Sequence, residues 1–125
     1  MTMFTPELTR QLAAELQQAQ DTRTQLEHFS KRFPGMTIED GYRVSRAWVV
    51  LQLAQGRRVI GHKIGLTSRA MQQSSQIDEP DYGVLHDTMV IEDGAKVPFE
   101  RFIIPRVEIE LVFVLGKPLK GPGVG

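Results

Sequence analysis

The chain contains no cysteine among its 125 residues. Without thiols it can build neither a disulfide scaffold nor a thiolate nucleophile, and its composition suits a reducing compartment. It also lacks a surplus of either charge, because 15 Lys and Arg residues balance 15 Asp and Glu residues. This balance argues against a nucleic acid or a membrane surface as a partner held by bulk electrostatics.

Two further absences concern location. No apolar run approaches the roughly 20 residues that a helix needs to span a bilayer. The N-terminus has no basic stretch followed by an apolar one, so it does not resemble a signal peptide. We therefore expect a cytoplasmic protein, and a length of 125 residues suggests one domain with a core of its own.

Helical patterns fill the first half of the chain. The Thr-Pro-Glu sequence at residues 5–7 is typical of a helix start. Residues 37–40 resemble a capping box and predict a second helix from about residue 38 to 55. The apolar residues expected to face the core are Leu8, Leu12, Leu16 and Ala19 in the first helix and Val44, Trp48, Leu51 and Ala54 in the second.

The hydrophobic period changes near residue 58. Residues 59–66 alternate as in a strand, with Lys63 between two glycines on one face and His62 on the opposite, core-facing side. Shorter strands are predicted at 84–85 and 89–91. Helices followed by strands indicate an α+β fold, with an N-terminal helical region over 1–57 and a strand-rich region over 58–125.

The most informative segment is an acidic strand predicted at residues 105–115. Glu108 and Glu110 lie on one face of it, roughly 6.6 Å apart at a rise of about 3.3 Å per residue. Two carboxylates this close suit a hard cation such as Mg²⁺. A solvated ion pair with Arg106 on the same face is the alternative. No segment that could cover this strand follows it, so we expect a truncated chain or one that oligomerises.

Two more side chains are candidates for chemistry. Lys63 has room in front of it because glycine lets a ligand approach closely, although a surface lysine beside two packing glycines fits the same pattern. Asp81 is a candidate general base on a Pro- and Gly-flanked loop, although Asp also favours turns for purely local reasons. Thr67 and Ser68 can hold a carboxylate or cap a short helix. No histidine has a second one at zinc-ligand spacing.

Three segments in order carry a resemblance to a known family. They are GHKIGLTSRAMQ at 61–72, EPDYG at 79–83 and IPRVEIE at 104–110. Together they resemble the 2-keto-4-pentenoate hydratase family of the fumarylacetoacetate hydrolase-like superfamily. Within that family, the members that hydrate 2-oxohept-4-ene-1,7-dioate in homoprotocatechuate degradation are the most similar. The resemblance covers nearly the whole chain.

The family implies a mixed β-roll that holds a divalent metal, Mg²⁺ or Mn²⁺, with three carboxylates. Glu108 and Glu110 match two of them, and the third is expected on a later strand beyond Gly125. The region 58–125 would then be the first, incomplete part of the catalytic β-roll domain. We therefore expect the chain to be an N-terminal fragment that is inactive alone.

The reaction that the resemblance implies is the addition of water to a 2-oxo-alkenoate, here a 2-oxo-dicarboxylate. Lys63 and Asp81 would be catalytic, and Leu66, Thr67, Ser68 and Arg69 would bind the substrate. The family also implies a homo-oligomer and an association with another enzyme of its pathway. A sister 2-oxo-3-hexenedioate decarboxylase, a Schiff base at Lys63 and a non-catalytic partner-binding subunit are the alternatives.

Overall fold

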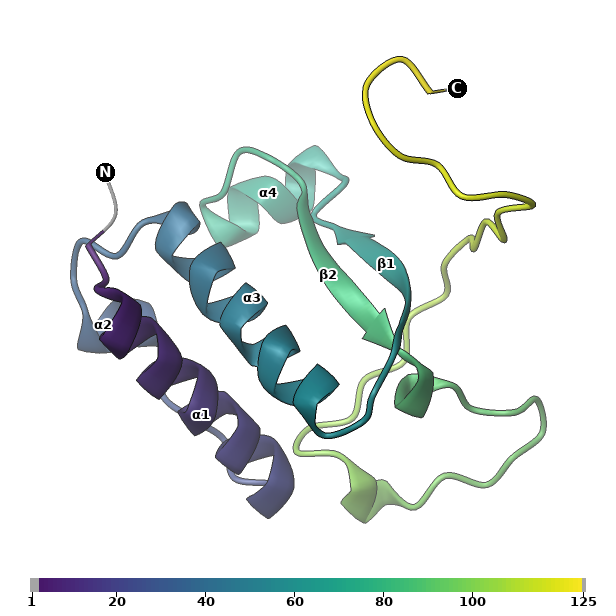
Figure 1. Ribbon diagram of the computed structural model, residues 1–125, viewed down its shortest axis with the longest axis horizontal. Helices are drawn as coiled ribbons and strands as arrows, with labels where there is room; N and C mark the ends of the chain where they lie inside the picture. Colours follow the sequence, from purple (N-terminus) through teal and green to yellow (C-terminus); the bar gives the residue numbers. More distant parts are fainter. Residues whose placement is uncertain (1–2, 125) are drawn as a thin grey trace.

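A computed structural model describes residues 3–124, and Figure 1 shows its arrangement. In that range the elements are α1 (Pro6–Thr22), α2 (Phe29–Arg32), α3 (Ile38–Ala54), β1 (Val59–Gly65), α4 (Arg69–Ser75), β2 (Asp81–His86) and the 3₁₀ turns η1 (Asp87–Met89) and η2 (Phe99–Arg101). β1 and β2 pair as an antiparallel sheet. Helices and a sheet in one chain confirm the α+β class. The mixed β-roll stays a prediction, because the described residues form only this sheet.

The two long helices begin where the sequence predicts. Thr5 Oγ1 accepts a hydrogen bond from Leu8 N at 3.1 Å and caps α1. Thr37 and Asp40 form the predicted capping box at the start of α3. Caps satisfy backbone N–H groups that have no partner in the first helical turn, so local sequence determines both starts. None of the helices between residues 3 and 124 is long and apolar enough to cross a membrane.

α1 and α3 lie side by side and run in the same direction (Figure 1). Near their starts, Phe4 N donates to Asp40 Oδ1 at 3.1 Å. Near their ends, Gln52 Nε2 donates to Gln20 Oε1 at 3.5 Å. Parallel neighbours need a return segment between them, and residues 23–37, which include α2, supply it.

The hydrophobic core lies between these helices and the return segment. Its buried members are Phe4, Leu12, Ala13 and Val44, and the partly buried residues packed against them are Leu8, Leu16, Phe29, Phe33, Met36, Ala47 and Trp48. The predicted stripe of α1 is confirmed, as is the first half of the stripe of α3. Leu51 and Ala54 are exposed instead, because the last turns of α3 bury Gln52 toward the sheet.

Asp40 links the start of the chain to the start of α3. It is fully buried, and its carboxylate accepts hydrogen bonds from the backbone N–H groups of Met3, Phe4 and Thr37 and from the Thr37 hydroxyl. Burial by itself would raise the pKa of Asp40, but these hydrogen bonds together lower the pKa to about 2. The carboxylate is therefore ionised in the folded protein at neutral pH.

The sheet is attached to α3 through β2. Tyr82 stacks on Tyr42 of α3 with ring centroids 4.6 Å apart. At the other end of β2, His86 is 1% exposed, and its Nε2 lies 2.6 Å from Gln52 Oε1. The prediction that His62 packs on a core face is wrong, because His62 is exposed and β2 provides the buried histidine.

Two predicted strands are absent from the described range. Met89 lies in η1, and residues 90–91 have no regular structure. Residues 105–115 are not paired with either strand, and Val107 and Ile109 are 95% and 100% exposed. An alternating sequence becomes a strand only when a partner satisfies its backbone N–H and C=O groups. No such partner lies beside this segment within residues 3–124.

Replacing Asp40 with Asn should lower stability at neutral pH and flatten its pH dependence. The native carboxylate has a pKa of about 2, below its ordinary value of 3.8, so it stabilises the fold above pH 3.8. That contribution is lost as the pH falls toward 2. Urea unfolding followed by Trp48 fluorescence at several pH values will show this, with Glu39→Gln on the exposed side of α3 as the control. Equal pH slopes for the wild type and Asp40→Asn would contradict the assignment.

Candidate active site

The two faces of the sheet differ in character. Antiparallel pairing places Lys63 opposite Gly83 and Gly65 opposite Asp81, so these four residues share one face. The other face carries Tyr82 and turns toward α3. Alternation in β1 thus separates Lys63 from the helices, as the sequence predicts. The face with Lys63 is open because glycine leaves its surroundings without side chains.

Three of the predicted site residues meet on this face. Lys63 Nζ donates to Glu108 Oε2 at 3.2 Å and to Glu110 Oε1 at 2.5 Å. The hydrogen bonds that Lys63 donates to Glu110 and Glu108 raise the pKa of Lys63, and the hydrogen bond from Lys63 lowers the pKa of Glu110. The side chains of Lys63 and Glu110 remain 43% and 47% exposed, so solvent screens the pairs. Both carboxylates converge on one positive charge.

Asp81 lies on the same face, across the strand pair from Lys63. Its carboxylate sits over Gly65, where an added Cβ would overlap Asp81 Oδ1. A side chain at residue 65 would therefore displace the Asp81 carboxylate from its position. Gly83, opposite Lys63, has open space in front of it. Lys63 and Asp81 are diagonal neighbours on this face, a relation that places Cβ atoms at about 7–8 Å in antiparallel sheets.

The predicted substrate-binding residues follow β1 directly. Leu66 adopts a left-handed backbone with φ +52°, which costs a residue with a side chain about 1 kcal/mol. Its carbonyl oxygen accepts a hydrogen bond from Gln72 Nε2 at 2.7 Å. Ser68 Oγ accepts a hydrogen bond from Met71 N at 3.2 Å and caps α4. Helix capping was one of the two roles expected for Ser68. Thr67 is exposed between them.

Arg69 is not brought to the same place as Lys63. It lies in the first turn of α4 and lines a separate cavity of about 300 Å³. Its neighbours in the lining are Gln72, Gln73, Gln76, Ile77 and Asp78. The structure therefore joins Lys63 to the two glutamates on the face that also carries Asp81, and it places Arg69 at a different cavity.

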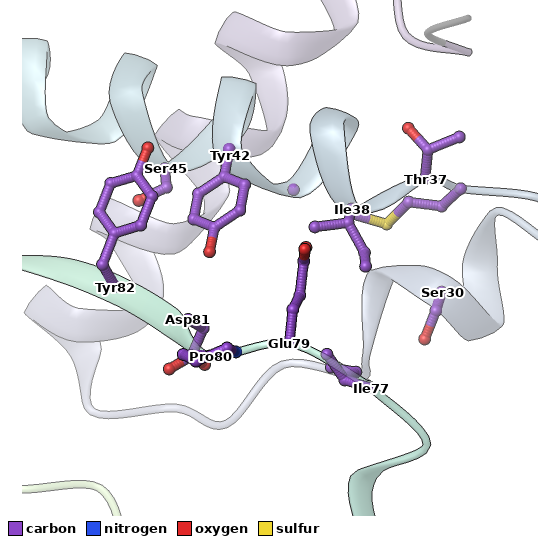
Figure 2. A pocket seen from close by; sticks show the side chains of 12 residues that line it. Ser30, Thr37, Ile38, Tyr42, Ser45, Ile77, Glu79, Pro80, Asp81 and Tyr82 are labelled. Atoms are coloured by element: carbon purple, nitrogen blue, oxygen red, sulfur yellow. The ribbon is translucent and has the colours of Figure 1, made fainter. Parts of the chain in front are cut away.

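A larger cavity of about 390 Å³ lies between the first half of α3 and the segment that enters β2. Figure 2 shows Tyr42 and Tyr82 on one side of it and Glu79 extending toward α3. Asp81 also lines this cavity, so it borders both the cavity and the face with Lys63. This cavity could not be predicted from the sequence, because the cavity forms only where β2 packs against α3.

Glu108 and Glu110 offer the oxygen donors that Mg²⁺ and Mn²⁺ prefer. Their convergence on the Lys63 ammonium group shows that both carboxylates reach a single cation. Among residues 3–124, however, no group of three or more His, Cys, Asp or Glu side chains gathers to hold a metal ion. The pair therefore fits two ligands of a divalent ion. Water, substrate or residues outside the described range would have to complete the coordination.

Comparison with curated proteins finds relatives along nearly the whole chain. A 2-oxo-hept-4-ene-1,7-dioate hydratase of Escherichia coli is 54% identical over 120 residues, which cover 96% of this chain and 45% of that protein. A 2-hydroxypent-2,4-dienoate hydratase of Pseudomonas putida is 42% identical over 118 residues, which cover 94% and 53%. Other relatives bear the name 2-keto-4-pentenoate hydratase. The chain is a relative of the 2-keto-4-pentenoate hydratases. It spans about half the length of the curated relatives it matches.

A solved structure also resembles the chain. The 4-oxalocrotonate decarboxylase from Pseudomonas putida G7, complexed with magnesium and adipate, aligns with a TM-score of 0.68 and 30% identity. The alignment covers 70% of this chain and 34% of the decarboxylase. No protein-family model matches the chain. The chain thus resembles hydratases in sequence and this decarboxylase in fold.

Two features of the candidate site in this chain were not predicted from its sequence. Gln72 belongs to the 61–72 motif, but a glutamine on a short helix gives no local signal of a contact six residues back. The close approach of the Asp81 carboxylate to Gly65 depends on the register between β1 and β2. The sequences of these two strands do not specify that register. The flanking glycines were a usable signal for Lys63, because they left its face free of side chains.

Replacing Gly65 with Ala should displace the Asp81 carboxylate, because the new methyl group would occupy the position of Asp81 Oδ1. We expect lower thermal stability and a changed environment of Asp81, measured by side-chain carboxyl chemical shifts. Gly83→Ala is the matched control, since a Cβ there meets open space. If both variants leave Asp81 unmoved, the close approach is refuted.

Proposed function

We propose that the chain carries the acid–base residues and part of the metal site of a hydratase that adds water to a 2-oxo-alkenoate. The observation behind this proposal is the meeting of Lys63, Glu108 and Glu110 on the glycine-lined face that also holds Asp81. The relatives named as 2-oxo-alkenoate hydratases support it. The substrate would be a 2-oxo acid, with 2-oxohept-4-ene-1,7-dioate as the first choice, in aromatic catabolism.

The cofactor would be Mg²⁺ or Mn²⁺, held by Glu108 and Glu110. When bound, such an ion supplies a Lewis acid that polarises the 2-oxo group and stabilises negative charge on its oxygen. The related decarboxylase has been solved in complex with magnesium and with calcium, which supports a divalent cation. The two carboxylates would hold the ion beside the face on which Lys63 and Asp81 lie.

Lys63 and Asp81 would move the protons. Asp81 is exposed and accepts the proton that leaves the substrate carbon next to the double bond. Lys63, as an ammonium group, donates a hydrogen bond to the oxygen on which negative charge develops. Asp81 returns that proton to C5, which moves the double bond into conjugation with the 2-oxo group and makes C4 electrophilic. The regenerated carboxylate then takes a proton from the water that adds at C4 and delivers it to C3. Each step uses a group on the same face of the sheet.

Leu66, Thr67, Ser68 and Arg69 would hold the substrate carboxylate at the end of β1. Thr67 offers an exposed hydroxyl and backbone N–H next to the strand that carries Lys63. Arg69 would contact the second carboxylate of a dicarboxylic substrate from the adjoining cavity. The residues 1–57 would then form a helical support and residues 58–125 the first part of the catalytic domain.

Oligomerisation and association with another pathway enzyme belong to the same proposal. The segment 105–115 exposes a row of apolar side chains, among them Val107, Ile109 and Phe113. Apolar strands with free backbone groups pair readily with another strand. A further segment of protein, from this polypeptide or from a second copy, would cover it.

The test is an assay of the protein expressed from its whole reading frame, with Mg²⁺ and the dienol forms of 2-oxohept-4-ene-1,7-dioate and 2-oxopent-4-enoate. Loss of dienol absorbance with formation of a 4-hydroxy-2-oxo acid is expected. Glu108→Gln should lower the activity roughly 100-fold or more, given the several kcal/mol that a metal ion supplies. Exposed Glu92→Gln is the matched control and should retain wild-type activity.

Two results would change the assignment. Release of CO₂ from a 2-oxo-3-hexenedioate, without hydration, would identify the related decarboxylase activity instead. Borohydride trapping of substrate on Lys63 would show a Schiff base and contradict the role of Lys63 as a hydrogen-bond donor. Full activity of Glu108→Gln would refute the metal site.

A further inference from the structure

The turn between β1 and α4 has a backbone conformation that its sequence does not favour. Leu66 has φ +52°, one of three non-glycine residues in the described chain with a positive φ. The other two, Arg23 and Gln76, follow helices as C-caps, where the left-handed conformation is common. Leu66 follows a strand, so no helix end explains it. Backbone strain of this kind persists only where the surroundings impose it.

One side chain contacts the backbone at this residue. Gln72 Nε2 donates to Leu66 O at 2.7 Å, and both residues are half-buried. Gln72 is itself fixed on α4, because its backbone N donates to Ser68 O at 3.0 Å. The Ser68 hydroxyl caps the same helix. A hydrogen bond therefore connects Leu66, the first residue of the turn, to the helix that follows the turn.

We propose that Gln72 is a positioning residue for the substrate-binding turn. By holding the Leu66 carbonyl, it fixes the direction in which the chain leaves β1. That direction determines where Thr67 lies relative to Lys63, which is four residues earlier on the strand. The inference rests on the proposed function, in which residues 66–69 hold the carboxylate of the 2-oxo acid. Gln72 itself does not contact the substrate in this scheme.

The neighbouring residue Gln73 provides a matched control for Gln72. Gln73 is the same residue type on the same helix, but it is exposed. Methionine has nearly the length of glutamine and no N–H donor. Gln72→Met therefore removes the hydrogen bond to Leu66, and Gln73→Met tests the same chemical change where no such contact exists.

The experiment compares Gln72→Met, Gln73→Met and wild type in the protein expressed from its whole reading frame. We measure KM and kcat for the dienol form of 2-oxopent-4-enoate, the melting temperature, and the backbone chemical shifts of Leu66 and Thr67, which report φ. For Gln72→Met we expect KM to rise roughly five-fold, as for the loss of one net hydrogen bond, with kcat nearly unchanged. The Leu66 shifts should leave the left-handed range. Gln73→Met should match wild type.

A second variant separates positioning from general stability. In the Gln72→Met background, Leu66→Gly should recover part of the lost affinity, because glycine enters the left-handed region without a side-chain penalty. A fall in melting temperature with unchanged KM would overturn the inference, as would Leu66 shifts that stay left-handed in Gln72→Met. If wild type hydrates no 2-oxo-alkenoate, the proposed function fails, and the Leu66 shifts alone decide whether Gln72 sets the turn.

Discussion

The buried contact between Gln52 Oε1 and His86 Nε2, at 2.6 Å, is the interaction on which the position of the site depends. It joins the end of α3 to the end of β2 where water is excluded. Because a carboxamide oxygen accepts, Nε2 is the donor in this contact, and Nδ1 has no hydrogen-bond partner in the described structure. A buried group left without its partner costs about 1 to 3 kcal/mol. Loss of either side chain would therefore loosen the sheet from the helices.

The positions of Asp81 and Lys63 depend on this attachment of β2 to α3. The Tyr42–Tyr82 stack fixes the start of β2, and the Gln52–His86 contact fixes its end. Asp81 opens the strand so placed, and the antiparallel register then brings Lys63 of β1 to the same face. Among the described residues, the hydrophobic core between α1 and α3 includes none of these groups. It acts on the site by holding α3, to which β2 is bound.

The sequence predicted the features that short-range chemistry determines. The Thr37–Asp40 capping box, the face of Lys63 and the Ser68 cap follow from a few neighbouring residues, and all three are confirmed. It failed where distant segments decide. Strand alternation favoured His62 as the core histidine, and only the packing of β2 on α3 selects His86. The strand at 105–115 failed for a related reason, since alternation specifies which side chains share a face but provides no partner.

That unpaired segment still delivers its two glutamates to Lys63, and the charge at the meeting point explains what the arrangement can do. One ammonium group compensates one of the two carboxylates of Glu108 and Glu110, so their cluster keeps a net negative charge. Asp81 adds another carboxylate on the same face. Ion pairs this exposed add little stability, so they do not explain the gathering of acidic groups. A face that keeps excess negative charge beside open glycine surface instead meets the electrostatic condition for the divalent cation that the proposed hydratase requires.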